Sequence, residues 1–194
     1  FAMSEALTII LKRNDPTSAA KQVSLTELGS IKINKEERTK MYKTIPRSSV
    51  IGFLIGVLPG AGATIASFLA YGMERNVVSD EEKEKFGKGS VNGLSAPETA
   101  NNAACSGSFV PMLTLGIPGS GTTAVMLGAL LGFGVQPGPR LYMTNPEIFW
   151  SIIMSMYIGM VILLILNLPL IPYIARILAV PKNYLIPLIL FFSV

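Results

Sequence analysis

The sequence predicts an all-α polytopic membrane protein in which two of the membrane segments are broken by proline and glycine. Half of its 194 residues are hydrophobic and only 14% are charged, and the mean hydropathy is +0.50. The charges are clustered, so that residues 48–73, 99–139 and 148–175 contain no Asp, Glu, Lys or Arg. A bilayer-spanning helix needs roughly 20 mostly apolar residues, and each of these stretches is long enough.

The first elements are predicted to be the end of a preceding membrane helix, at 1–11, and a basic loop, at 12–47. This loop holds nine Lys or Arg residues against four acids. Basic loops stay on the cytoplasmic side of the membrane, so we expect the loop to be cytoplasmic. Within it, Asn34 followed by Glu37 is typical of a helix start. It leads into a short basic helix at 35–43, either solvated or lying on anionic headgroups.

The first broken membrane segment is predicted at 48–73, where Leu58-Pro59-Gly60-Ala61-Gly62 interrupts an apolar run. A polar link follows at 74–98. Its Ser79-x-x-Glu82 spacing indicates a capping box, and we expect a charged helix to continue to Phe86 and stop at Gly87. Residues 89–93 read as a flexible polar connection.

The second charge-free region, 99–139, is 41 residues long, about twice one span. Its middle, Leu115-Gly116-Ile117-Pro118-Gly119-Ser120-Gly121, cannot continue a helix well. Either two spans meet there, or two half-helices approach the midplane as a discontinuous helix or a re-entrant hairpin. Residues 148–175 read as an ordinary transmembrane helix with aromatic residues at its ends. Residues 184–194 read as a truncated membrane helix, so the sequence, which also lacks an initial Met, is expected to be a fragment.

The two interruptions resemble each other, which indicates an internal repeat. Pro59-Gly60-Ala61-Gly62-Ala63-Thr64 and Pro118-Gly119-Ser120-Gly121-Thr122-Thr123 agree at four of six positions. Paired interruptions of this kind point to a transporter site, because breaking a helix in lipid is costly unless the freed backbone lines a cavity. The predicted substrate-binding residues are Pro59, Gly60, Ala61, Gly62, Thr64, Pro118, Gly119, Ser120, Gly121, Thr122 and Thr123.

These residue types suit an anionic ligand. Glycines let a ligand approach the main chain, and the unpaired N–H groups at a helix start attract anions. The threonine and serine hydroxyls add hydrogen-bond donors for a carboxylate, and carbonyls of the preceding half-helices could coordinate sodium. The alternative is that the glycines serve close helix packing, as the four-residue spacing of Gly52, Gly56 and Gly60 also suggests.

A second polar group stands where the long apolar region begins and supplies the predicted ion-coupling candidates, Glu98, Thr99, Asn101 and Asn102. Asparagine offers amide oxygens to a cation, and Glu98 is the acid available for proton coupling because the sequence has no His. Glu98 is equally compatible with capping a helix start. Apart from a possible sodium site, no metal site and no cofactor are expected, and no nucleic-acid motif accompanies the basic residues.

Four ordered motifs closely resemble the TctA family, the large membrane subunits of tripartite tricarboxylate transporters. They are Gly56-Val57-Leu58-Pro59-Gly60-Ala61-Gly62, Ala96-Pro97-Glu98-Thr99-Ala100-Asn101-Asn102-Ala103, Leu113-Thr114-Leu115-Gly116-Ile117-Pro118-Gly119 and Gln136-Pro137-Gly138-Pro139. The resemblance implies sodium- or proton-driven uptake of tricarboxylates or related carboxylates across the bacterial inner membrane. It also implies two partners, a periplasmic solute-binding protein and a small membrane subunit.

Two alternatives come from other functional classes. An intramembrane enzyme would need a nucleophile and base, a metal cluster or paired acids within its spans, and the sequence shows none of these. A passive channel or membrane scaffold without coupled transport would use the glycines only for packing. Uptake in vesicles distinguishes a coupled carrier from a channel, because a coupled carrier needs an ion gradient to accumulate solute, whereas a channel only equilibrates it.

Overall fold

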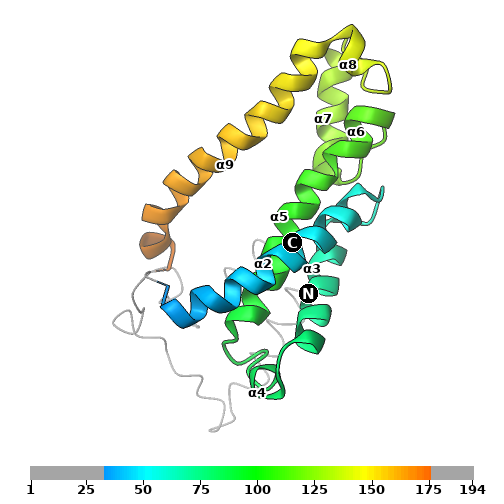
Figure 1. Ribbon diagram of the computed structural model, residues 1–194. Coiled ribbons are helices and arrows are strands. Elements are labelled where there is room, and N and C mark those ends of the chain that lie inside the picture. The colour runs from blue at the N-terminus through cyan, green and yellow to red at the C-terminus, as the bar shows by residue number, and fades with distance from the viewer. Residues whose placement is uncertain (1–32, 176–194) are drawn as a thin grey trace, which may run out of the picture. The chain divides into compact units, whose positions relative to one another are not determined.

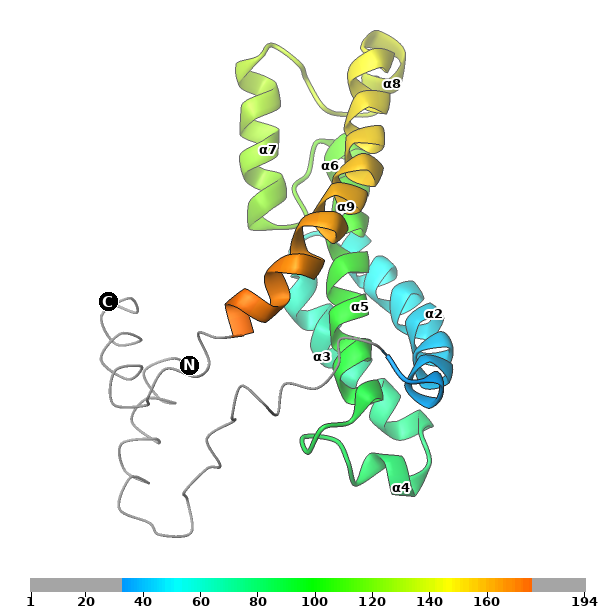
Figure 2. The same ribbon diagram turned by 90° about the vertical axis from the view of Figure 1, so that its left-hand side faces the viewer.

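The computed structural model describes residues 33–175, which contain helices and no strand (Figures 1 and 2). The membrane helices predicted at 1–11 and 184–194, and most of the basic loop, lie outside the described residues. Two compact units are present; the described part of one is 33–155, and the described part of the other is 156–175. The helices are α2 (Lys35–Val57), α3 (Gly62–Val77), α4 (Asp80–Lys83), α5 (Val91–Gly107), α6 (Phe109–Leu115), α7 (Gly121–Gly132), α8 (Leu141–Thr144) and α9 (Pro146–Ala175).

The start of α2 confirms the predicted helix start at Asn34 and shows a capping box there. The Asn34 side chain accepts from the helix amides, and the Glu37 carboxylate accepts from the Asn34 amide at 2.8 Å. The helix does not stop at residue 43, however, but continues through Pro46 to Val57. The helix therefore runs without interruption through residue 48, with Thr44 and Ser48 buried on either side of the proline. The boundary between basic loop and membrane segment at that residue stays a prediction.

Helices α2, α3 and α5 pack together along stripes of small residues. Helices α2 and α3 form an antiparallel hairpin whose ends meet at residues 58–61, while α5 lies against both. A Cβ added at Gly52 or Gly56 would overlap the backbone of Ala100 or Ala104 in α5. These two glycines thus serve close helix packing, whereas Gly60 has nothing within 4 Å of an added Cβ.

The polar link differs from its prediction. The Ser79 side chain makes no capping hydrogen bond, and α4 is a single turn ending at Lys83. The reason is that Glu82 does not reach back to Ser79: it accepts hydrogen bonds from Lys40, at 3.0 Å, and from Ser90, at 3.3 Å. Residues 89–93 are not a flexible link, because Ser90 caps α5 by accepting from the Gly93 amide at 3.0 Å.

The second break lies between α6 and α7, as predicted. Gly116, with φ of 70°, ends α6 in the left-handed conformation that glycine favours. The Gln136-Pro137-Gly138-Pro139 segment packs back onto α6, where the Gly138 amide donates to the Leu113 carbonyl at 3.2 Å. A second apolar cluster joins α6, α7, α8 and the start of α9; its buried members are Met112, Leu113, Val135 and Leu141.

Helix α9 agrees with the predicted transmembrane helix at 148–175. Its residues Pro146–Ile171 are the one stretch within 33–175 that is long and apolar enough to cross a bilayer. Helix α7 is apolar but has only 12 residues. The all-helical prediction is confirmed for the described residues, while further crossings stay a prediction.

The described residues do not show the predicted internal repeat. Gly60 and Gly62 have φ of 81° and 68°, whereas their counterparts Gly119 and Gly121 are not among the positive-φ glycines. The helix starts also differ, since Ala61 makes no side-chain cap and the matching Ser120 forms a capping box. The two hexapeptides share residues but not a backbone conformation.

Candidate functional site

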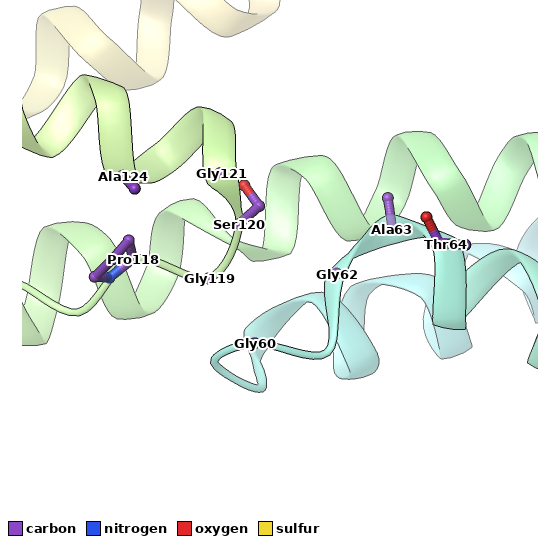
Figure 3. Close-up of a pocket in the computed structure, with 9 residues that line it drawn as sticks. All are labelled: Gly60, Gly62, Ala63, Thr64, Pro118, Gly119, Ser120, Gly121 and Ala124. Carbon is purple, nitrogen blue, oxygen red and sulfur yellow. The ribbon is translucent and has the colours of Figure 1, made fainter. Parts of the chain in front are cut away.

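The two proline-glycine interruptions line one pocket. It has a volume of about 510 Å³ and opens between the α2–α3 connection and the α6–α7 connection (Figure 3). Its lining is mostly main chain and small side chains: Gly60, Gly62, Ala63, Thr64, Pro118, Gly119, Ser120, Gly121 and Ala124. The breaks, more than fifty residues apart in sequence, thus meet in space.

One wall of the pocket is the start of α3. In the described part of the chain, the amides of Gly62, Ala63 and Thr64 have no hydrogen-bond acceptor, and neither does the Thr64 hydroxyl. No side chain caps this helix. An uncapped helix start presents free N–H donors and the positive end of the helix dipole. This wall is therefore suited to an anion.

The facing wall is the start of α7, where a capping box pairs the amides and hydroxyls of Ser120 and Thr123 with each other. The Ser120 amide donates to the Thr123 hydroxyl at 2.8 Å, and the Thr123 amide donates to the Ser120 hydroxyl at 3.3 Å. The two hydroxyls lie 3.1 Å apart. Within residues 33–175 the amides of Gly121 and Thr122 keep no acceptor. The start of α7 thus also offers free N–H groups beside the pocket.

The glycines of the pocket have different roles. A Cβ at Gly60 or Gly62 would meet nothing within 4 Å, but both residues have positive φ, which disfavours other side chains. At Gly119 an added Cβ would lie 2.9 Å from the Ser108 Cβ. Gly119 therefore allows the loop to approach α5 and α6 closely, and Gly60 and Gly62 shape the open side of the pocket.

Seven of the eleven predicted substrate-binding residues line the pocket. The others, Pro59, Ala61, Thr122 and Thr123, do not, and Thr123 is only 1% exposed. Sequence reasoning missed two lining residues, Ala63 and Ala124. Ala63 stands inside the first hexapeptide, so the motif itself contained the signal, and Ala124 follows the second hexapeptide directly.

The predicted ion-coupling residues lie elsewhere, on α5, and none of them lines the pocket. Glu98, Asn101 and Asn102 are exposed. The Asn102 amide nitrogen donates to the Glu98 carbonyl of its own helix at 2.9 Å, and the Asn101 nitrogen donates to the Ser67 hydroxyl of α3 at 3.4 Å. Residues 33–175 contain no group of three or more His, Cys, Asp or Glu side chains that could hold a metal ion.

Comparison with known proteins identifies the family of the chain. The family described as "Tripartite tricarboxylate transporter TctA family" matches it over residues 1–194. The chain belongs to the TctA family. This is a family of membrane components of transporters and not a family of enzymes.

Two curated proteins of Agrobacterium vitis are similar to this TctA-family chain. One, "Uncharacterized 52.8 kDa protein in TAR-I ttuC' 3'region", is 39% identical over 181 residues. The other, "Uncharacterized protein in TAR-II ttuC' 3'region", is 45% identical over 142 residues. The alignments cover 93% and 73% of this chain but only 36% and 58% of the two relatives. No solved structure matches the chain.

Proposed function

We propose that this chain is part of the membrane subunit of a secondary transporter that takes up tricarboxylates or related carboxylates. The observation that carries the proposal is the pocket between the two broken segments, where the starts of α3 and α7 present free amides. Several N–H donors with two helix dipoles behind them favour a ligand with more than one negative charge.

The pocket has few side-chain groups that would bind a particular ligand tightly. Its lining contains no charged residue, and the Thr64 hydroxyl is the one side-chain donor there without a partner in the described residues. A carrier must release its ligand as well as bind it, so recognition by main-chain amides and helix dipoles is appropriate. This arrangement supports a carboxylate as the ligand class. The size of the ligand is limited by the pocket volume of about 510 Å³.

Family membership supports the rest of the proposal. A tripartite transporter of this kind comprises a periplasmic solute-binding protein, a small membrane subunit and the large subunit to which this chain belongs. We place the large subunit in the bacterial inner membrane as a multi-pass protein. Uptake is coupled to sodium or protons, without a further cofactor.

Uptake into vesicles that contain the complete subunit and its partners tests the proposal. A panel of di- and tricarboxylates is offered with and without an ion gradient. Replacing Thr64 by Val removes one donor from the pocket and keeps the side-chain shape. Because a hydrogen bond to a charged group contributes about 1.5–3 kcal/mol, we expect the KM to rise about tenfold or more.

Thr122→Val is the matched control, because Thr122 lies in the first turn of α7 but does not line the pocket. Its KM should stay within about twofold of the unmodified protein. Equal KM values for both variants and the unmodified subunit would remove the pocket from the binding site. Equilibration without accumulation under an ion gradient would show a passive channel.

A further inference from the structure

The charge-free part of the α2–α3 hairpin is short. Arg47 is the last charged residue of α2, and Glu74 is the first charged residue of α3. Val57, where α2 ends, is ten residues beyond Arg47, and Gly62, where α3 begins, is twelve residues before Glu74. At 1.5 Å per residue, the hairpin extends about 15–18 Å beyond these charges. The hydrocarbon core of a bilayer is about 30 Å thick, so the connection at 58–61 can reach about half-way across.

The charges at the base of the hairpin lie at one level. The Arg47 guanidinium donates to the Glu74 carboxylate at 2.7 Å, and Thr44 and Asn92 donate to the same oxygen at 2.8 and 3.1 Å. Glu74 is fully buried, whereas 38% of the Arg47 side chain is exposed. Arginine at the edge of a membrane buries its stem and turns its charged end to the headgroups. This level is therefore suited to the membrane surface.

Helix α5 gives a similar depth independently. Gly52 and Gly56 of α2 each face the alanine of α5 that is 48 residues further on in the sequence, so the two helices run parallel. The last charged residue of α5 is Glu98. In the second interruption, a Cβ added to Gly119 would lie 2.9 Å from the Ser108 Cβ. Ser108 is ten residues beyond Glu98, about 15 Å along the helix, so both interruptions lie about 15 Å from the charges on this side.

Charges return at a comparable distance on the other side of the pocket. Figures 1 and 2 show α4 and α6 at opposite ends of α5, and α6 ends at Leu115, seven residues or about 10 Å beyond Ser108. The segment that packs onto this end of α6, through the Gly138–Leu113 hydrogen bond, reaches Arg140 two residues later. The pocket thus lies near the middle of a charge-free layer whose thickness is close to that of the hydrocarbon core.

We propose that α2 and α3 form a re-entrant hairpin. The chain enters the bilayer at the level of Arg47, turns at 58–61 near the bilayer centre and returns to the same side. The charged residues of 35–47 and 74–88 then share one side of the membrane, which is the cytoplasmic side because basic loops stay there. Arg140 lies on the periplasmic side. This placement is independent of the ligand that the pocket binds.

The alternative is two full crossings, with the connection at 58–61 in the periplasm. Each arm would then need roughly 20 mostly apolar residues, but the charge-free arms have ten and twelve, 48–57 and 62–73. A deeper position would draw Arg47 and Glu74 into the hydrocarbon, where charges are costly. The arms themselves expose large apolar side chains, which include Val50, Phe53, Leu54, Ile65, Phe68 and Leu69.

Labelling of single cysteines in sealed vesicles tests this topology. In the complete subunit with its other cysteines removed, cysteine replaces one residue at a time at Lys43, Leu58, Lys88 and Arg140, all of which are exposed. A charged, membrane-impermeant maleimide is added to right-side-out and to inside-out vesicles. We expect Lys43→Cys and Lys88→Cys to react only in inside-out vesicles, and Arg140→Cys only in right-side-out vesicles.

Leu58→Cys reports the depth of the turn, with Arg140→Cys as its matched control. Because a charged reagent does not readily enter the hydrocarbon core, Leu58→Cys should react at least about tenfold more slowly than Arg140→Cys in right-side-out vesicles. Denaturation in detergent should make all four cysteines equally reactive, which shows that each variant is present. Reaction of Lys43→Cys or Lys88→Cys in right-side-out vesicles, or equal rates at Leu58→Cys and Arg140→Cys there, would overturn the proposal.

Discussion

Hydroxyl groups near the pocket divide into those that hold a helix in place and those that are free to meet a ligand. The hydroxyls of Ser120 and Thr123 bond each other's amides at the start of α7, while the Thr64 hydroxyl has no partner among the described residues. All three side chains carry a hydroxyl, and the sequence predicted the same role for all three. Only the backbone at each helix start separates the two groups.

Thr123→Ala should weaken the start of α7. It removes one half of the capping box, and loss of such a cap costs about 1 kcal/mol. We expect a lower midpoint of thermal unfolding and reduced uptake with an unchanged preference among carboxylates. Thr122→Ala, one residue earlier and exposed, should change the free energy of unfolding by about 0.5 kcal/mol or less. A large effect at residue 122 and none at 123 would contradict the assigned cap.

The four glycines that the sequence singled out all line the pocket, whereas only two of the four hydroxyl residues do. Proline and glycine break a helix wherever they occur in it, so the interruptions at 58–62 and 116–120 follow from local chemistry. Tertiary contacts decide whether a threonine faces a pocket, and they also decide whether Glu82 pairs with a lysine of another helix. Local sequence patterns do not contain these contacts. Glu74 was missed for that reason, since it reads as the first residue of a charged link.

At the scale of the elements, three helices carry buried stripes with four-residue spacing. They are Thr44, Ser48, Gly52 and Gly56 in α2, Ala66, Ala70 and Glu74 in α3, and Asn92, Ala96, Ala100 and Ala104 in α5. Each stripe is small and apolar over part of its length and polar at one end. The spacing is visible in the sequence, and following it would have placed Glu74 and Asn92 in the interface.

Gly52→Ala tests the packing of these stripes. The added methyl group would overlap the Ala100 backbone, and overpacking of this kind costs about 1–3 kcal/mol. We expect a clearly lower midpoint of thermal unfolding of the purified subunit. Gly72→Ala in α3 is the control, because a Cβ there meets nothing within 4 Å. Alanine favours the helix there by up to about 1 kcal/mol, so equal destabilisation by both variants would contradict the packing described.

An ion pair between Lys40 of α2 and Glu82 of α4 joins the two helices. It predicts that the stability of the folded protein depends on pH. The hydrogen bond from Lys40 lowers the pKa of Glu82 below its ordinary value of 4.5, and the hydrogen bond to Glu82 raises the pKa of Lys40 above 10.5. A lowered carboxylate pKa stabilises the folded protein above the ordinary pKa, and this stabilisation is lost as the pH falls through the lowered pKa.

The contribution of the pair should therefore be constant between about pH 5 and 10 and decline below this window as Glu82 is protonated. Thermal unfolding of the unmodified subunit and of Glu82→Gln, measured from pH 7 down to pH 3.5, checks this expectation. The difference between the two midpoints should be constant at first and then shrink. A difference that grows on acidification would contradict the assigned ion pair.

At the scale of the whole molecule, many large apolar side chains of the described residues are exposed, as expected of a protein in lipid. Most large side chains of α9, and the outward-facing Val50, Phe53 and Phe68 of the hairpin, are exposed. In lipid, irregular backbone is tolerated only where protein or a water-filled cavity surrounds it. The two proline-glycine connections face each other across the pocket, which would satisfy that condition at the membrane depth predicted for them. Composition alone could not predict their pairing.

The central claim is that the α2–α3 and α6–α7 connections line one pocket. Chemical cross-linking of these two connections tests it most directly. Cysteines replace Thr64 and Ser120 in a complete subunit whose other cysteines, Cys105 included, are removed, and a short bifunctional thiol reagent is added. We predict rapid cross-linking that a tricarboxylate slows. Ser67→Cys with Asn101→Cys, a pair whose native side chains are hydrogen bonded, shows that the reagent reaches this region. Cross-linking of that control pair but not of residues 64 and 120 would contradict a pocket built from both interruptions.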